Sequence, residues 1–140
     1  MEITLGLLAD AANLSQEGKL NVLGAFTNIN ASGFPARHPQ MQLVVEIQAS
    51  PGEVGATKHF EVKLIDEDGT ELGGTGGDFT VPQPQQAGQR VRMGVVIPLV
   101  DVVFNRAGNH VFDVLIDGDS KRQIPLTVLL IEGSQQADDN

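Results

Sequence analysis

Histidine is the side chain most often used for acid–base catalysis near neutral pH, and the sequence contains three. His38 lies in a proline-rich stretch, His59 is on the polar side of an alternating run, and His110 opens another run on its apolar side. They form no His-x-His or i, i+4 pair, and no carboxylate stands at a metal-ligand spacing from them. Dispersed histidines are typical of surface or satisfied core positions. We therefore predict no catalytic residue, and we expect His110 to be a buried polar plug.

Two acidic turns contain the oxygen ligands that Ca²⁺ prefers. Asp66-Glu67-Asp68-Gly69 and Asp117-Gly118-Asp119 resemble fragments of calcium loops, although both lack the glutamate and flanking helices of an EF-hand. Carboxylates from separate loops of a β-sandwich can still act together. Asp66, Asp68, Asp117 and Asp119 are therefore the metal-ligand candidates. The alternative, which we favour, is that Asp and Gly occur there because they form turns.

Asp10 is our candidate for a functional carboxylate. It is the one charged residue that interrupts the apolar N-terminal run, so it must have a partner or lie at the end of a sheet. No Gly-x-Ser-x-Gly nucleophile elbow is present. The glycine-rich segment 73–77 leads into Asp78-Phe79 and not into the Gly-Lys-[Ser/Thr] of a phosphate-binding loop. We predict no cofactor.

The composition excludes several classes of function. The 140-residue chain has 9 Lys and Arg against 18 Asp and Glu, which gives a net charge of −9. This charge disfavours sequence-independent binding of nucleic acids, which depends on basic side chains. The chain contains no Cys, Trp or Tyr. Their absence removes thiol chemistry and thiolate metal sites, and it disfavours ligand binding on exposed aromatic platforms.

The elements that must position these side chains are strands, because apolar and polar residues alternate with period 2 along most of the chain. The runs are interrupted by Asp-Gly turns and by loops rich in Pro, Gly and Gln. Only Ala9–Gln16 could form a turn or two of helix. We predict an all-β fold, an antiparallel immunoglobulin-like β-sandwich of seven to eight strands. The predicted strands are 3–9, 20–27, 41–48, 59–64, one ending at 79–81, 90–97, 110–116 and 123–131.

The chain length predicts one domain, residues 1–132, followed by a disordered polar tail at 133–140. There is no basic segment before the first apolar run and no stretch of 18 apolar residues. We therefore expect no signal peptide and no membrane span, and a cytoplasmic location by default.

Some apolar residues occupy the predicted solvent face of the strands. Examples are Val44, Val96, Leu115 and Leu129. Such residues are either covered by loops or covered by a second subunit. We therefore expect a homodimer formed through an exposed apolar sheet face, and we predict no nucleic acid or membrane partner.

The N-terminal pattern Leu7-Leu8-Ala9-Asp10-Ala11-Ala12 followed by Gly18-Lys19-Leu20-Asn21-Val22-Leu23-Gly24-Ala25-Phe26 resembles the opening of a family of small uncharacterised bacterial proteins. The segments 38–41, 108–112 and 124–128 are similar to that family as well. The resemblance covers the chain up to about residue 131, and it implies a single β-sandwich domain. It implies no activity and no functional residues, because no function is established for the family.

These observations favour a non-enzymatic β-sandwich that binds a partner or associates with itself. The first alternative is a ligand-binding or Ca²⁺-binding sandwich that uses the acidic hairpin loops. The second is a hydrolase-like enzyme whose site, built from Asp10 or the histidines, has no recognisable motif.

Overall fold

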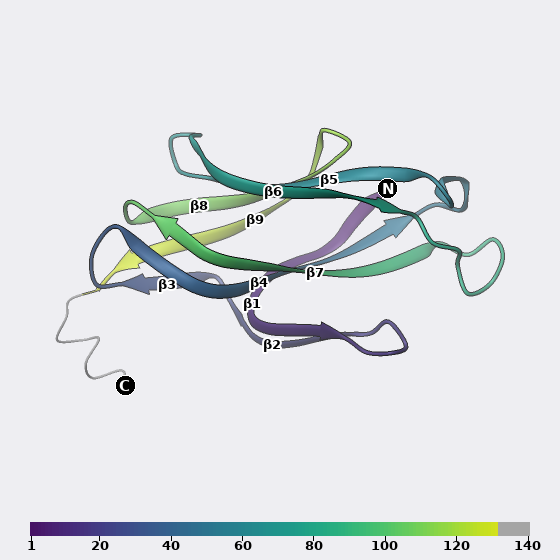
Figure 1. Cartoon of the computed structure of the whole chain (residues 1–140), viewed down its shortest axis with the longest axis horizontal. Helices are drawn as coiled ribbons and strands as arrows, with labels where there is room; N and C mark the ends of the chain where they lie inside the picture. Colours follow the sequence, from purple (N-terminus) through teal and green to yellow (C-terminus); the bar gives the residue numbers. More distant parts are fainter. Residues whose placement is uncertain (132–140) are drawn as a thin grey trace.

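The structure is a computed structural model, and it describes residues 1–131. It is all-β, and its nine strands in that range form two sheets (Figure 1). The strands are β1 (Glu2–Leu14), β2 (Leu20–Phe26), β3 (Asn28–Ala31), β4 (Ala36–Ala49), β5 (Thr57–Ile65), β6 (Glu71–Thr80), β7 (Val91–Phe104), β8 (Gly108–Ile116) and β9 (Asp119–Leu130).

The four-stranded sheet, sheet A, has the order β2-β1-β4-β7, and the five-stranded sheet, sheet B, has the order β3-β9-β8-β5-β6. The inward-facing residues of both sheets build one main apolar core. In sheet A the core uses alternate residues of β4, such as Met41, Leu43 and Val45, and in sheet B it uses Phe112 and Val114 of β8. The period-2 pattern of the sequence thus defines the two faces of each sheet.

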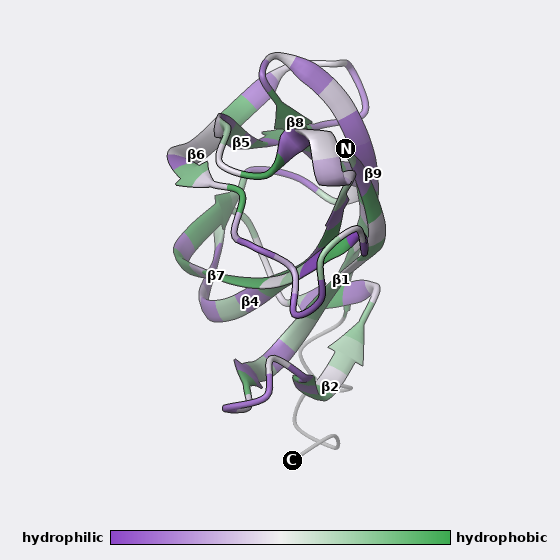
Figure 2. Ribbon diagram, turned by 90° about the vertical axis from the view of Figure 1, so that its right-hand side faces the viewer, coloured by the Kyte–Doolittle hydropathy of each residue, from purple (hydrophilic) through white to green (hydrophobic). Residues whose placement is uncertain are grey.

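β1 changes partners along its length. Residues 2–9 pair with β4, and residues 8–14 pair with β2. The second half of β1 therefore extends beyond β4 and forms a hairpin with β2, and this part of sheet A lies on the side away from sheet B (Figures 1 and 2). A Cβ atom built at Gly94 of β7 would lie only 2.6 Å from Leu14 Cδ2 and 2.9 Å from Leu20 Cδ2. The tip of the hairpin thus packs on the outer face of β7.

Part of the surplus of apolar residues noted in the sequence is covered within the chain itself. Val44 points to the outer face of sheet A, yet it is fully buried. Val96 and Leu115 are half-buried, whereas Leu129 is exposed. For Val44, a neighbouring part of the same chain provides the cover, and no second subunit is needed.

The Asp-Gly turns form where the sequence predicts them. Asp66–Gly69 joins β5 to β6, and Asp117-Gly118 joins β8 to β9. Both Asp117 (φ 50°) and Gly118 (φ 84°) have positive φ, as a type I′ hairpin turn requires.

Three details of the predicted fold are wrong. There are nine strands in residues 1–131 and not seven or eight, because the four-residue strand β3, which alternates between exposed and buried residues, forms directly after β2. The sandwich is not purely antiparallel, since β3 pairs with β9 in parallel. The segment Ala9–Gln16 is not helical, because residues up to Leu14 belong to β1 and pair with β2. The sole helical turn of the described chain is a 3₁₀ turn at Pro51–Glu53.

The two sheets meet closely on one side. There, the Cβ position of Gly6 on β1 lies 3.1 Å from side-chain atoms of Arg122 and Ile124 on β9. On the other side, the edge strands β6 and β7 face each other without pairing. No helix within residues 1–131 is long and apolar enough to cross a membrane. The predicted tail at 133–140 lies outside the described residues.

Candidate functional site

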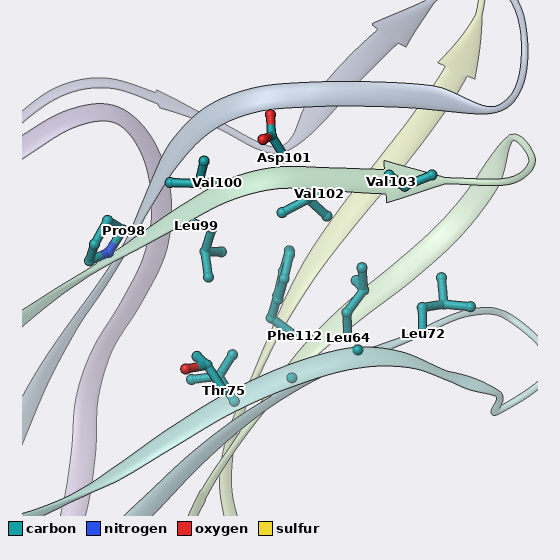
Figure 3. Close-up of a pocket in the computed structure, with 13 residues that line it drawn as sticks. Leu64, Leu72, Thr75, Pro98, Leu99, Val100, Asp101, Val102, Val103 and Phe112 are labelled. Carbon is teal, nitrogen blue, oxygen red and sulfur yellow. The ribbon is translucent and has the colours of Figure 1, made fainter.

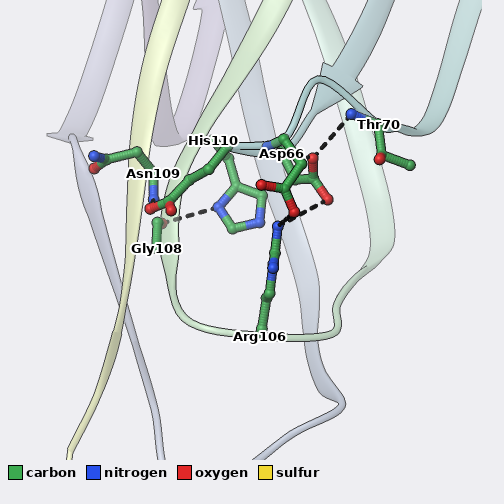
Figure 4. A network of polar contacts seen from close by, with 8 residues as sticks. Asp66, Thr70, Arg106, Gly108, Asn109 and His110 are labelled. Atoms are coloured by element: carbon green, nitrogen blue, oxygen red, sulfur yellow. Dashed lines mark hydrogen bonds and ion pairs between the residues drawn. The ribbon is translucent and has the colours of Figure 1, made fainter.

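The first acidic turn is fastened to the neighbouring loop between β7 and β8 (Figure 4). Asp66 Oδ1 accepts hydrogen bonds from the backbone N–H groups of Asp68 (3.0 Å) and Thr70 (2.9 Å). Arg106 of the facing loop donates to Asp68 and, at 3.5 Å, to Asp66 Oδ2. The backbone N–H of Thr70, followed by that of Asp68 and the charge of Arg106, keeps the pKa of Asp66 below its usual value against the opposing effect of burial.

Glu67 completes this connection. Its Oε1 accepts a hydrogen bond from the backbone N–H of Asn109 at 2.6 Å. A Cβ atom at Gly108, where φ is 131°, would lie 2.4 Å from the same oxygen. Gly108 is therefore required both by its backbone angle and by the close approach of Glu67. The carboxylates of this turn bind backbone donors and an arginine, which is a structural role.

The second acidic turn lies at the other end of sheet B. The β5–β8 register sets Ile65, next to the first turn, opposite Val111, and Phe60 opposite Ile116, next to the second turn. Asp117 Oδ1 accepts a hydrogen bond from the backbone N–H of His59 at 2.9 Å. Its Oδ2 forms an ion pair with Lys58 Nζ at 3.6 Å.

Asp119 is exposed at the start of β9. Asp66 and Asp68 therefore cannot act together with Asp117 and Asp119. Within residues 1–131, no group of three His, Asp or Glu side chains could hold a metal ion.

The three histidines lie on three different strands. His59 Nδ1 is 2.7 Å from Asp78 Oδ1 across the β5–β6 pair, and its Nε2 is 4.0 Å from Glu61. This histidine–carboxylate pair is on the exposed face of sheet B and borders none of the hollows described below. His38 of β4 packs against the ring of Phe26.

His110 is buried, as the sequence predicts, with 2% of its surface exposed. Its Nδ1 lies 3.0 Å from the carbonyl oxygen of Gly108, and its ring meets Phe104 edge-on. Its Nε2 is buried and has no hydrogen-bond partner in the described chain. His110 thus serves as a core side chain.

Asp10 lies on the part of β1 that pairs with β2, opposite Gly24. It is exposed, and Gly24 (φ 72°) makes room for it, since a Cβ atom there would be 2.5 Å from Asp10 Oδ2. Within residues 1–131, none of the ion pairs formed by histidine involves Asp10. The close approach of the Asp10 carboxylate thus explains why the N-terminal pattern has glycine at position 24.

A groove of about 390 Å³, lined mostly by apolar residues, lies between the edges of β6 and β7 (Figure 3). Its base is formed by core residues of both sheets, including Leu64, Leu99 and Phe112. Along β7, the exposed side chains of Val100 and Val103 border it. We call this hollow the β6–β7 groove.

The residues of β6 explain why the groove exists. Gly73 is paired with Leu64 and Thr75 with Val62, so Gly73 and Thr75 face inward like those buried partners. A Cβ atom at Gly73 would have no atom within 4 Å. Small residues at positions where β5 has Leu and Val leave the space between β6 and β7 unfilled.

The lining of the groove offers little for acid–base chemistry. Asp101 is its one ionisable residue, and it forms an ion pair with Arg37 at 3.2 Å. A second hollow of about 580 Å³ lies outside sheet A, beside the tip of the β1–β2 hairpin. Its charged lining mixes acidic residues such as Glu46 with basic ones such as Arg92. This mixture favours neither an anionic nor a cationic ligand.

Comparison with protein families gives a match over residues 4–129 to a family of unknown function, DUF6941. The chain belongs to this family. The match covers the N-terminal pattern and the segments 38–41, 108–112 and 124–128, which carry the resemblance described above. It indicates no activity, because the function of the family is unknown. A comparison with curated proteins finds no match.

Two solved structures are similar to parts of the DUF6941 chain. One is the alkylpurine DNA glycosylase AlkC from Pseudomonas fluorescens, bound to DNA containing an abasic site analog, at 15% identity and a TM-score of 0.35 over 73% of this chain. The other is a β-glucuronidase of glycoside hydrolase family 2, at 10% identity and a TM-score of 0.33 over 69% of this chain. The chain spans 27% of the first and 10% of the second. Similarity at this level supports no argument about function.

The sequence did not reveal the groove or the His59–Asp78 pair. The groove had one signal, the glycine-rich segment 73–77, which indicates a bulge or a close approach when read alone. Only the register with β5 shows that Gly73 and Thr75 face inward. The His59–Asp78 pair follows from the same register, because both residues lie on the polar face of strands joined by a short turn.

Proposed function

We propose that this member of DUF6941 is a non-enzymatic binding module, and that the β6–β7 groove holds an apolar part of its ligand. The observation that carries the proposal is an unfilled apolar space of about 390 Å³ that reaches the core residues Leu64, Leu99 and Phe112. Ligand sites are typically concave, largely apolar and about 300–1,000 Å³ in volume. With Asp101 paired to Arg37, the groove offers binding surface and not a pair of catalytic groups.

An immunoglobulin-like arrangement supports this proposal. In immunoglobulin domains, strands G, F and C are neighbours in one sheet, and A, B, E and D in the other. The orders β9-β8-β5 and β1-β4-β7 correspond to G-F-C and A-B-E. The segment between β6 and β7 supplies no counterpart to strand D at the free edge of β7. The groove lies where such a strand would cover the core.

The experiment is to titrate the native protein with an apolar fluorescent probe, 1-anilinonaphthalene-8-sulfonate. Thr75→Phe places a large side chain in the groove, and Thr80→Phe makes the same change on the outward face of the same strand. We expect saturable fluorescence enhancement with the native protein and with Thr80→Phe, and its loss with Thr75→Phe. Circular dichroism and a melting curve check that each variant is folded. No saturable binding to the folded protein, or equal binding by both variants, would contradict the proposal.

A further inference from the structure

Both long sides of the β6–β7 groove are strand edges without a partner strand. Within residues 1–131, β6 pairs only with β5, and β7 pairs only with β4. In Figure 3 the two strands run along the groove, and side chains such as Leu99 and Phe112 lie between them. A free strand edge presents unpaired backbone N–H and C=O groups. The groove therefore combines an apolar base with hydrogen-bonding groups along its rims.

This combination discriminates between kinds of apolar ligand. A hydrocarbon ligand such as an acyl chain covers the two edges without pairing them, and a polar group buried without a hydrogen bond destabilises a complex. An extended peptide pairs with backbone groups through its own backbone, while every second side chain points to the same face. The unpaired edges thus favour a peptide over a lipid-like ligand.

β6 is the better edge for pairing with a peptide. The part of β7 that lines the groove contains Pro98, which has no N–H, and Asp101, whose φ is 54°. β6 has no proline and no residue with positive φ. Its two charged residues, Glu71 and Asp78, lie outside the part that lines the groove. Four of its ten residues are glycine, which is typical of strands that another backbone approaches closely.

The length of the groove sets the size of the peptide. Residues 72–75 of β6 and residues 98–103 of β7 line it. An extended chain rises about 3.3 Å per residue, so a segment of about four to six residues spans this length. Such a segment directs about two or three alternate side chains into the groove.

Charge favours a basic peptide over an acidic one. Asp101 lines the groove, and none of the lining residues is basic. Asp101 and Glu71 each have a cation beside them, Arg37 at 3.2 Å and Lys63 at 3.6 Å, so the preference comes mainly from the net charge of −9 on the whole chain. A field of this sign attracts basic ligands and repels acidic ones.

We propose that the occupant of the β6–β7 groove is an extended peptide segment of another protein, which adds a strand to the free edge of β6. Its alternate apolar side chains enter the space bounded by Leu64, Leu99 and Phe112, and basic residues flank them. This inference rests on the proposed function, because it names the class of ligand for the same groove.

Selection from a peptide-display library tests the class of ligand. The full chain is the bait, and the probe is a library of about eight random residues, a length that exceeds the groove when extended. We expect enriched peptides with apolar residues at alternate positions and with lysine or arginine beside them. Synthetic copies should bind the native protein and Thr80→Phe, and binding should be lost with Thr75→Phe. No enriched peptide, or peptides without this alternation, would overturn the inference.

Methylation of the peptide backbone separates strand pairing from apolar contact. N-methyl groups at alternate residues remove the N–H groups along one edge of the extended peptide and leave its side chains unchanged. We expect at least one of the two alternate sets to abolish binding. Hydrogen exchange should also slow at residues 72–77 of β6 in the complex, with β2 unchanged as the internal control. Binding that survives methylation of either set would show that no strand is added.

The inference and the proposed function fail in different ways. If 1-anilinonaphthalene-8-sulfonate binds in the groove and no peptide does, the ligand is a small apolar molecule, and only the peptide inference is overturned. If neither the fluorescent probe nor any peptide binds, the proposed function fails as well.

Discussion

At the scale of single residues, two polar side chains hold opposite ends of the sandwich. His110 is buried beside Phe104 near the β5–β6 turn. Glu53 lies beyond β4 at the other end and binds four donors, one of which is the Ser50 hydroxyl at 3.1 Å from Oε1. Its Oε1 accepts from the backbone N–H of Ser50 (3.0 Å) and pairs with the Met1 amino group (3.2 Å), while Oε2 lies 3.7 Å from Lys58. Both side chains contribute to the stability of the fold through these contacts.

His110→Ala is expected to lower the free energy of unfolding by about 2–4 kcal/mol. The change leaves a cavity in the core and removes the hydrogen bond to Gly108. His59→Ala is the matched control, because His59 is half exposed and its pair with Asp78 is a surface contact worth about 0–1 kcal/mol. Urea unfolding followed by circular dichroism measures both. Equal losses in the two variants would show that His110 is not the core side chain described here.

Glu53→Gln is expected to reduce stability in a pH-dependent way. The hydrogen bond from Ser50 N–H, helped by the Met1 amino group and the Ser50 hydroxyl, lowers the pKa of Glu53 from its usual 4.5 to about 2, against the opposing effect of burial. A lowered pKa in the folded state means that the carboxylate stabilises the fold above its unfolded pKa of about 4.5. This contribution is lost as the pH falls toward 2.

The measurement is the difference in melting temperature between wild type and Glu53→Gln as a function of pH. We expect a constant difference above about pH 5 that shrinks steadily down to pH 2. Glu71→Gln removes an exposed carboxylate that pairs with Lys63 at 3.6 Å and serves as the control. A difference that stays constant at low pH would contradict the assigned cause of the pKa shift.

At the scale of elements, the β1–β2 hairpin determines how sheet A is covered. Its tip packs on β7 at the one place where that strand has glycine, Gly94.

Gly94→Val is expected to push Leu14 and Leu20 away and to lower the free energy of unfolding by about 1–3 kcal/mol. The amides of β2 should then exchange with solvent faster, as hydrogen exchange would show. In Gly73→Val, where no atom lies within 4 Å of the Cβ position, we expect no loss of stability. Unchanged exchange in Gly94→Val would disprove the packing of the hairpin on β7.

The elements that the sequence predicts are those whose geometry is local. Asp117-Gly118 is a recognisable hairpin turn because a type I′ turn needs two residues with positive φ. Ala9–Gln16 could be mistaken for a helix because alanine favours helices, whereas its actual strand pairing with β2 depends on residues further along the chain. The parallel β3–β9 pair joins segments about 100 residues apart, and no local pattern encodes it. The groove was missed for the same reason, since it needs the register of β6 against β5.

At the scale of the whole molecule, the two sides of the sandwich differ. On one side β1 and β9 approach closely, and on the other the sheets are held apart with small residues in β6 facing β7. The acidic turns at both ends are occupied by internal donors and cations, such as Arg106 and Lys58. The proposed binding function therefore rests on the β6–β7 groove, which is apolar and concave.

Filling the groove should stabilise the whole molecule if the space is as unfilled as its lining indicates. Thr75→Leu adds apolar volume at an inward-facing position, next to Val62. Cavity-filling changes commonly add about 0.5–2 kcal/mol. Thr80→Leu makes the same change on the outward face, where it meets water and the hydroxyl of Thr57, and we expect no gain there. Urea denaturation measures both variants.

Because burial of a leucine in the groove competes with any ligand, Thr75→Leu should also weaken binding of the fluorescent probe. A gain in stability with unchanged probe binding would place the probe elsewhere, and no gain at all would mean that the groove is too exposed to water to bury an apolar side chain.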